Sequence, residues 1–435
     1  MLEKTFCSSP WFHLRLTSDG SFETCRWAYK PDHKYNFSNT SLIQFYNSDQ
    51  MKELRTELLE GHKPKVCQSC YYEESFDKLT GRVRQLHKSV IDKNNFALTL
   101  RSSPHYNMFL HSYENNGHSE YNPTDLQIDL GNLCNSGCIM CDPTYSSRLE
   151  SDYKKLAKQS QLFFDPIKTQ NWSSDINLKN KLIDELSDIK NIKYIHFLGG
   201  ETLYHSAFYD ICEALIKTNQ AQDIIVGTTT NGTIFNSRLE NLISSFKEFH
   251  LGISIESVLK LNDYIRYPSK IENILENLEN FLNLRNKCST LQISLRITPN
   301  IFTIYELDKL FEYMLQKKVI AESCNILADP QHLRMELLPD DIRQEILHKL
   351  NSLVDKYNLN KINIVNVRRN DLIDQVTANL ILDYKNFIES YKMPSDVDKH
   401  RYNLVEWLQS FERLRKNSIL DYAPRYEKFL RNYGY

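Results

Sequence analysis

Residues 126–141 read Leu126-Gln-Ile-Asp-Leu-Gly-Asn-Leu-Cys134-Asn-Ser-Gly-Cys138-Ile-Met-Cys141 and place three cysteines in a C-x3-C-x2-C pattern. The alternating apolar residues before Cys134 predict a strand, so the cysteines follow that strand in a loop. Three thiolates this close cannot all pair as disulfides, and one loop can wrap them around a single inorganic centre. Three ligands leave one iron of a [4Fe–4S] cube open, unlike the four-cysteine ligation of electron-transfer clusters. An open iron can bind a substrate or a cofactor, so the pattern indicates chemistry.

At these residues the chain resembles the radical S-adenosylmethionine (SAM) enzymes. The resemblance implies that Cys134, Cys138 and Cys141 ligate a [4Fe–4S] cluster whose open iron chelates the amino and carboxylate groups of SAM. Reductive cleavage then yields methionine and a 5′-deoxyadenosyl radical, which abstracts a hydrogen atom from the substrate. Met140 stands where relatives carry a bulky residue that packs near adenine. The alternatives are a zinc knuckle without its fourth ligand, or three buried thiols.

A second motif of the same family follows the next expected strand. Gly199, Gly200 and Glu201 resemble the start of its Gly-Gly-Glu-Pro motif, with Thr202 in place of the proline. Glycines there let the backbone approach a ligand closely, and a carboxylate can receive an ammonium group. The resemblance implies that this segment contacts the amino group of SAM.

Three later strand ends add candidate SAM-binding residues. Thr230 and Asn231 belong to a Thr-Asn-Gly turn, which the resemblance places on the SAM rim mainly as architecture. Ser254 and Glu256 share one face of a strand by two-residue alternation. The resemblance places Ser254 near the ribose or carboxylate of SAM and Glu256 near SAM or substrate, whereas a satisfied buried polar end is the alternative for Glu256. Arg296 has the guanidinium that suits a carboxylate, and a structural ion pair is its alternative.

Strands and helices alternate from residue 125 onward. The strands are expected at 126–130, 194–198, 223–228, 249–255, 292–297 and 323–327. The helices are expected near 146–160, 177–189, 206–218, 236–246, 262–285 and 303–317. Six such units predict an α/β fold with a partial (β/α)6 TIM-like barrel, the fold that the resemblance also implies. Its ligand site lies at the carboxyl ends of the strands.

Composition shifts divide the chain into four expected segments. Residues 1–85 form a Cys-rich auxiliary-cluster module, and 86–122 read as a linker or irregular insertion. Residues 123–338 form the radical SAM partial barrel. Residues 339–435 form a mainly helical C-terminal extension, with a short strand expected at 361–367.

The first segment carries four cysteines, Cys7, Cys25, Cys67 and Cys70, in the order Cys…Cys…C-x2-C. So small a segment buries little apolar area, so a metal staple is physically sensible. Four thiolates suit either a structural zinc ion or a second [4Fe–4S] cluster. The segment resembles the twitch and SPASM auxiliary-cluster modules, which implies iron–sulfur and a role in passing an electron.

Composition limits the remaining possibilities. The chain has 435 residues, a net charge of -2 and 25% charged residues, so nucleic acid is an unlikely partner on electrostatic grounds. No apolar run approaches membrane-spanning length, and the N-terminus lacks the apolar region of a signal peptide. Seven of the ten cysteines lie in clustered motifs, which suits metal binding in a reducing cytoplasm.

The sequence therefore predicts a radical SAM enzyme with one SAM-binding cluster and one auxiliary cluster. On the frequencies of the family, its substrate is a peptide, a protein or a small molecule of natural-product biosynthesis. The cluster needs an electron donor such as flavodoxin or ferredoxin. Two alternatives remain at this point: a catalytically silent, metal-stapled binding or regulatory protein, and a radical SAM enzyme that modifies nucleic acid.

Overall fold

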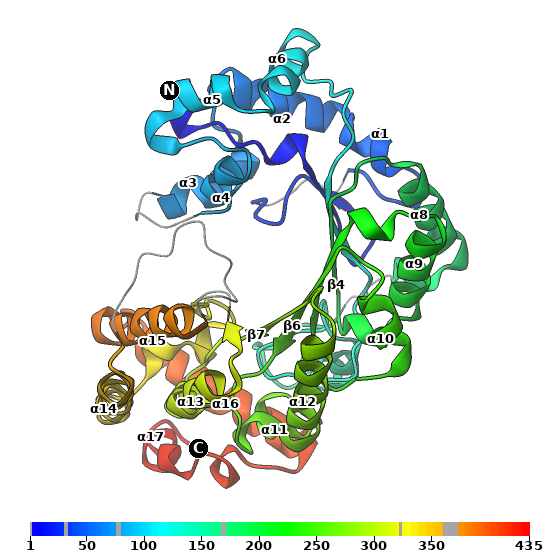
Figure 1. Ribbon diagram of the computed structural model, residues 1–435. Helices are drawn as coiled ribbons and strands as arrows, with labels where there is room; N and C mark the ends of the chain where they lie inside the picture. Colours follow the sequence, from blue (N-terminus) through cyan, green and yellow to red (C-terminus); the bar gives the residue numbers. More distant parts are fainter. Residues whose placement is uncertain (1, 30–33, 75–79, 167–170, 322–323, 360–372) are drawn as a thin grey trace. The chain divides into compact units, whose positions relative to one another are not determined.

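The computed structural model describes residues 2–29, 34–74, 80–166, 171–321, 324–359 and 373–435 (Figure 1). Its strands are β1 (His13–Leu16), β2 (Phe22–Glu23), β3 (Asp125–Asp129), β4 (Tyr194–Leu198), β5 (Ile225–Thr230), β6 (Glu248–Ser254), β7 (Leu291–Arg296) and β8 (Ile320–Ala321). Its helices are α1 (Leu42–Tyr46), α2 (Asp49–Leu59), α3 (Gln68–Glu74), α4 (Gly81–Lys88), α5 (Phe96–Ser102), α6 (Tyr106–Glu114), α7 (Glu150–Leu156), α8 (Ile176–Asp188), α9 (Ser206–Lys217), α10 (Ser237–Ile243), α11 (Leu261–Ile265), α12 (Ile271–Lys287), α13 (Leu307–Lys317), α14 (Asp340–Tyr357), α15 (Ile373–Ser390), α16 (Val397–Arg415) and α17 (Glu427–Arg431). Within the described ranges, no helix combines the length and the apolar character needed to cross a membrane.

The strands form one eight-stranded sheet in the order β2-β1-β3-β4-β5-β6-β7-β8. β1 pairs with β3 in parallel, β3 with β4 in parallel and β7 with β8 in parallel, whereas β1 and β2 form an antiparallel hairpin. The expected α/β class with a mostly parallel sheet is confirmed. The sheet has more strands than the six expected, because the N-terminal hairpin joins its edge. A four-residue strand is too short to give a clear periodic signal.

The last strand lies earlier than expected. We expected it at 323–327, but β8 covers Ile320–Ala321. Residues 324–327 have no regular secondary structure. The helix α13 ends at Lys317, and the next residue, Lys318, has a left-handed backbone with φ of 50°. The chain therefore leaves the helix in a single residue, and the apolar residues that follow enter the sheet at once. The expectation for 323–327 was wrong for this reason.

Residues 86–122 contain regular structure, unlike the linker or irregular insertion that we expected. They include α5 and α6, and Phe96, Met108 and Phe109 from these helices are buried. The ring of Phe109 lies 5.2 Å from those of both Phe6 and Trp11. Each helix is only two turns long and is bounded by polar residues, so its apolar positions did not give a periodic pattern. These helices complete the hydrophobic core around the N-terminal segment.

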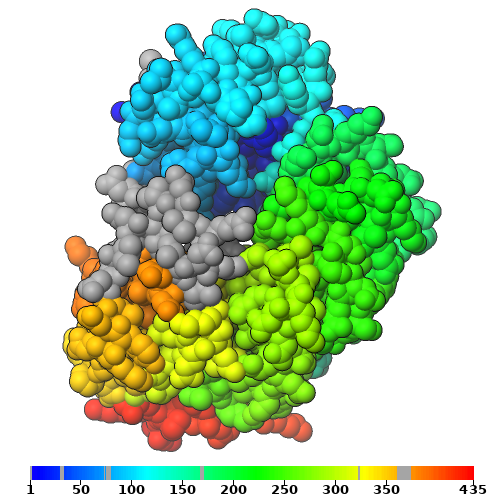
Figure 2. Space-filling model, in the orientation of Figure 1, coloured from blue at the N-terminus to red at the C-terminus, as the bar shows by residue number. Residues whose placement is uncertain are grey.

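Amphipathic helices cover the sheet, as the alternation of elements predicts. In α12 the buried residues are Ile271, Ile274, Leu278, Phe281 and Leu282, which share one helical stripe. After residue 339 the described chain is helical, and α14 packs beside α15 (Figures 1 and 2). The strand expected at 361–367 lies outside the described residues.

Contacts divide the chain into two compact units. Unit 1 comprises Met1–Gly131, Thr169–Gly227 and Asn241–Phe249, and unit 2 comprises Asn132–Lys168, Thr228–Glu240 and His250–Tyr435. The division follows packing and not chain order, so the chain enters each unit more than once. Unit 1 holds the Gly-Gly-Glu segment and the N-terminal cysteines, and unit 2 holds the C-x3-C-x2-C loop.

Candidate functional site

The three cysteines of the C-x3-C-x2-C pattern lie in the irregular loop that follows β3. Burial raises the pKa of the Cys141 thiol, and the neighbouring Cys138, Asp142 and Cys134 raise it further. Burial also raises the pKa of Cys138. The loop thus brings three thiols close enough for their charges to interact. A metal centre would replace the protons of such thiols and bind them as thiolates.

Asn231, which follows β5, holds the cysteine loop in place. Its side-chain nitrogen donates to Asn135 Oδ1 at 2.7 Å and to Ser136 Oγ at 3.0 Å. The Ser146 hydroxyl in turn donates to the Ser136 carbonyl at 2.6 Å. The Thr-Asn-Gly turn therefore supports the residues between the first two cysteines directly. Within that turn, Thr230 Oγ1 accepts a hydrogen bond from Gly232 N at 3.2 Å.

The variant Asn231→Ala is expected to loosen this loop. It removes the hydrogen bonds that the amide nitrogen donates to Asn135 and Ser136 and those that Oδ1 accepts from Thr233. Partners left unsatisfied in this part of the protein cost about 1–3 kcal/mol of the free energy of unfolding. Urea unfolding of the iron-free protein measures this loss. The control is Asn115→Ala, which removes an exposed bond to the His111 carbonyl in unit 1. Equal stability of the two variants would contradict the role assigned to Asn231.

Backbone hydrogen bonds tie the same loop to the chain after α11. Gly137 N donates to the Tyr267 carbonyl at 2.6 Å, and Ile139 N donates to the Ile265 carbonyl at 2.8 Å. These bonds fix the backbone on both sides of Cys138. A rigid ligand loop places its thiols before any metal binds, which lowers the ordering cost of binding.

A buried ion pair lies beside Cys138. Glu256, 1% exposed, accepts from Arg266 Nη2 at 2.5 Å and from Thr298 N at 2.7 Å. Arg266 Nη1 lies 3.8 Å from Cys138 Sγ. Burial raises the pKa of Glu256, and the guanidinium of Arg266 opposes that shift. Both oxygens of Glu256 thus have protein partners, and the carboxylate orients Arg266 toward the sulfur.

Sequence reasoning did not assign Arg266 to the site. A lone arginine in a loop carries no local signal, since its partners Glu256 and Cys138 are 10 and 128 positions away.

Two other candidate residues of unit 2 lie at the ends of neighbouring strands. Ser254 is the last residue of β6, and Arg296 is the last residue of β7. The side chain of Arg296 lies against Gly252 in β6. Met140 Sδ accepts a hydrogen bond from Asn300 Nδ2 at 3.4 Å, so Asn300 fixes a side chain inside the cysteine loop.

The Gly-Gly-Glu segment follows β4 in unit 1. Gly199 has φ of 101°, and a Cβ at this position would lie 2.5 Å from the Gly131 carbonyl, so glycine is required. Glu201 is 1% exposed, and its Oε1 accepts a hydrogen bond from Leu203 N at 3.1 Å. The turn places Gly199, Gly200 and Glu201 at the carboxyl end of their strand, as the sequence predicts.

The four N-terminal cysteines form a second group of thiols in unit 1. Burial raises the pKa of Cys7 to about 12, and Cys25 and Cys70 add to the shift. Burial also raises the pKa of Cys67, which Cys7, Cys25 and Cys70 raise further. Residues 60 positions apart in the chain are therefore brought into one neighbourhood. Cys7 and Cys70 are buried and Cys25 and Cys67 are half-buried. Their thiolates would repel one another, so a cation would stabilise the ionised state.

Buried polar contacts order the chain around this second group. Arg82 Nη1 donates to the Phe6 carbonyl at 2.9 Å, and its Nη2 lies 2.5 Å from Glu74 Oε2. The Tyr71 hydroxyl donates to the Thr5 carbonyl at 2.8 Å. Cys7 itself belongs to the hydrophobic core that includes Phe109.

In the part of the chain that the structure describes, no group of three or more His, Cys, Asp or Glu side chains has the spacing of a site for a metal ion. A single zinc ion needs all its ligands within bonding distance of one point. In a [4Fe–4S] cube each thiolate binds a different iron, so the thiolates are spread over a larger centre. The thiols that bind a cube therefore lie farther apart than the ligands of a single metal ion.

The site geometry thus defines a protein with a three-thiol loop at the end of a parallel strand and polar side chains at the ends of the neighbouring strands. Residues 128–307 match the family described as the Radical SAM superfamily. This match runs from within β3 to the first residue of α13. No curated protein matches the chain.

Solved structures give fold-level likenesses. The chain is similar to "Native anSMEcpe with bound AdoMet", with 17% identity and a TM-score of 0.37, over 54% of this chain and 61% of that chain. It is similar to SuiB of Streptococcus suis bound to S-adenosylmethionine, with 11% identity and a TM-score of 0.33, over 70% of this chain and 63% of that chain. A further structure of SuiB is bound to the precursor peptide SuiA and gives 11% identity and a TM-score of 0.34, over 71% of this chain and 64% of that chain. The matched region spans less than two thirds of each of these proteins.

Proposed function

We propose that this chain is a radical SAM enzyme in which Cys134, Cys138 and Cys141 ligate a [4Fe–4S] cluster. The observation that carries the proposal is the C-x3-C-x2-C loop, whose three thiols interact with one another within the residues that match the Radical SAM superfamily. Three protein ligands leave one iron for a further ligand, which we assign to SAM.

The residues around the loop fit such a group. Three thiolates carry negative charge into a buried site, and the guanidinium of Arg266 lies 3.8 Å from Cys138 Sγ to offset it. When bound, the cluster and SAM together supply an electron and a 5′-deoxyadenosyl radical that removes hydrogen from an unactivated carbon. The protein supplies orientation and excludes water and quenching reactions.

The strand ends supply the proposed SAM contacts. Glu201 and the two glycines before it receive the amino group, Arg296 the carboxylate and Ser254 the ribose or carboxylate. Met140 packs near adenine and is held there by Asn300. Glu256 acts through Arg266, because both of its carboxylate oxygens accept hydrogen bonds from protein groups.

The N-terminal group of Cys7, Cys25, Cys67 and Cys70 is proposed to hold a second [4Fe–4S] cluster. Four cysteines saturate such a cluster, so it transfers an electron and does not bind substrate. The pKa of Cys67 is raised by burial and by Cys7, Cys25 and Cys70, so the four thiols lie close enough to share one cationic occupant. The resemblance of this segment to twitch and SPASM modules favours iron–sulfur over zinc.

The substrate that we propose is a peptide or a small molecule, and the electron donor a flavodoxin or ferredoxin. A net charge of -2 gives no electrostatic footprint for nucleic acid. A reducing cytoplasm is the compartment that suits ten free cysteines.

Anaerobic reconstitution tests the proposal. The reconstituted protein is expected to contain about eight irons per chain, and to release 5′-deoxyadenosine when SAM and dithionite are added. Iron and sulfide analysis and chromatography of the nucleoside are the measurements. A protein that takes up iron in neither site and never cleaves SAM would leave the binding-protein alternative.

A further inference from the structure

A buried arginine from α16 contacts the cysteine loop. Arg415 is the last residue of α16, and its side chain is 4% exposed. Its Nη2 donates to the Gly137 carbonyl at 2.8 Å, between Cys134 and Cys138. The two contacting residues are 278 positions apart in the chain. Nothing in the family motifs assigns a role to this helix.

Two aromatic rings and a carboxylate fix the guanidinium in place. It lies 4.8 Å from the ring centroid of Tyr267 and 4.3 Å from that of Phe411. Its Nη2 is 3.8 Å from Asp152 Oδ2, which is too long for a hydrogen bond. Tyr267 also accepts the backbone hydrogen bond from Gly137, so the arginine and the loop share a support.

Gly137 allows this close approach. A Cβ at that position would lie 3.2 Å from Arg415 Nη2 and 3.1 Å from Leu149 Cδ2. A side chain at this position would be tightly packed against both atoms, so Arg415 or Leu149 would have to shift. The glycine between the first two cysteines therefore has a packing reason that involves α16.

The direct contacts leave the charge of Arg415 only partly compensated. One neutral carbonyl and one distant carboxylate offset a buried guanidinium weakly, and its Nε has no hydrogen-bond partner within the described residues. The hydrogen bond to the Gly137 carbonyl places the guanidinium beside the loop that carries Cys134 and Cys138. A negatively charged group held by these cysteines would add the compensation that the direct contacts lack.

We infer that Arg415 is a positioning residue for the bound cluster, which holds the ligand loop through Gly137 and sets the reduction potential through its fixed positive charge. This inference rests on the proposed function. A cation near a cluster favours the reduced, more negative state, so removing it lowers the potential. Groups that hydrogen-bond to metal ligands, or that place a charge near them, tune both the affinity for the metal and its reduction potential.

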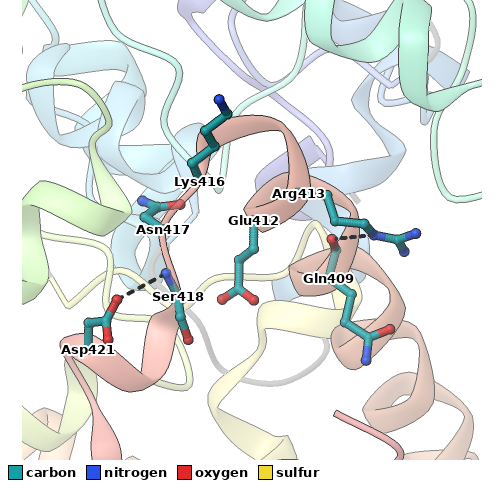
Figure 3. Close-up of a pocket in the computed structure, with 7 residues that line it drawn as sticks. All are labelled: Gln409, Glu412, Arg413, Lys416, Asn417, Ser418 and Asp421. Atoms are coloured by element: carbon teal, nitrogen blue, oxygen red, sulfur yellow. Dashed lines mark hydrogen bonds between the residues drawn. The ribbon is translucent and has the colours of Figure 1, made fainter.

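Three variants of the full chain test the inference. Arg415→Gln removes the charge and the reach to Gly137. Arg415→Lys keeps the charge but loses the planar group that lies over both rings and donates to the carbonyl. The control is Arg413→Gln on the same helix, whose exposed side chain lines a surface hollow with Gln409, Glu412, Lys416, Asn417, Ser418 and Asp421 (Figure 3).

Each reconstituted variant is analysed for iron and sulfide, for the rate of iron loss to a chelator, and for its midpoint potential by EPR-monitored titration. Arg415→Gln is expected to lose iron from the Cys134/Cys138/Cys141 site about tenfold faster than the wild type, and to lower the potential of that cluster. Arg415→Lys is expected to lose iron faster with a smaller change of potential. Arg413→Gln is expected to match the wild type in both readouts.

Wild-type iron retention and wild-type potential in Arg415→Gln would overturn the inference while SAM cleavage still supported the proposed function. If Arg415→Gln does not fold, an Arg415→Lys protein that holds its iron as firmly as the wild type would overturn it. A wild-type chain that binds no iron would overturn both proposals together.

Discussion

Replacing Cys134, Cys138 and Cys141 together by alanine is expected to abolish SAM cleavage and to lower the iron content from about eight to about four per chain. All three thiols lie in one loop, and the thiol of Cys141 interacts with those of the other two. Loss of one ligand weakens the cluster, and loss of all three leaves no site for it. The result separates the barrel cluster from any second centre.

The measurements are iron and sulfide per chain and the 5′-deoxyadenosine released under reducing conditions. A matched control is Cys288→Ala, which removes a thiol whose recorded partner is the Thr290 hydroxyl. This variant is expected to keep full iron and full cleavage. A triple variant that still cleaves SAM would contradict the assignment of the three cysteines.

Local patterns allowed much of the fold and of the cysteine loop to be predicted. The C-x3-C-x2-C run and the Gly-Gly-Glu turn each lie within a few residues of a strand end, so sequence spacing alone placed them. β4 covers the predicted residues 194–198, and β3 differs by one residue. Strong apolar alternation over five or more residues explains this agreement.

The supports of the site could not be predicted, because they join distant parts of the chain. Asn231 meets Asn135 across 96 positions, and Arg415 meets Gly137 across 278. Such contacts depend on how helices pack, and no short motif records them. The same limit hid the pairing of β1 with β3, which joins residues more than a hundred positions apart.

Glu256 shows how a local pattern can name a residue and leave its role open. Alternation along the strand placed it at the site end of β6, which left SAM, substrate or a satisfied buried position as its partner. The structure pairs it with Arg266 and the Thr298 backbone. Each oxygen of this buried carboxylate already accepts a hydrogen bond from the protein. Glu256 therefore affects the site by orienting Arg266.

The double variant Cys67→Ala/Cys70→Ala is expected to remove the other half of the iron and to leave 5′-deoxyadenosine release intact. Cys67 and Cys70 are the C-x2-C pair of the N-terminal group, and the thiols of Cys7, Cys25 and Cys70 all interact with that of Cys67. Without the pair, two thiols remain, which is too few to hold a cube. Iron is therefore expected to fall from about eight to about four per chain, this time from unit 1.

The same variant is expected to make the N-terminal part of unit 1 more sensitive to protease. Cys7 belongs to a core with Phe6, Trp11 and Phe109, and a metal centre bound at Cys7 links this core to α3. A matched control is Tyr72→Ala, which changes an exposed side chain two residues after Cys70 on α3. Loss of zinc with no loss of iron in the double variant would assign the site to a structural zinc ion. Radical chemistry would then proceed without a second cluster in this module, and the electron-relay role would be excluded. Loss of iron together with retained SAM cleavage but lost substrate turnover would place the electron-accepting step at the N-terminal cysteines.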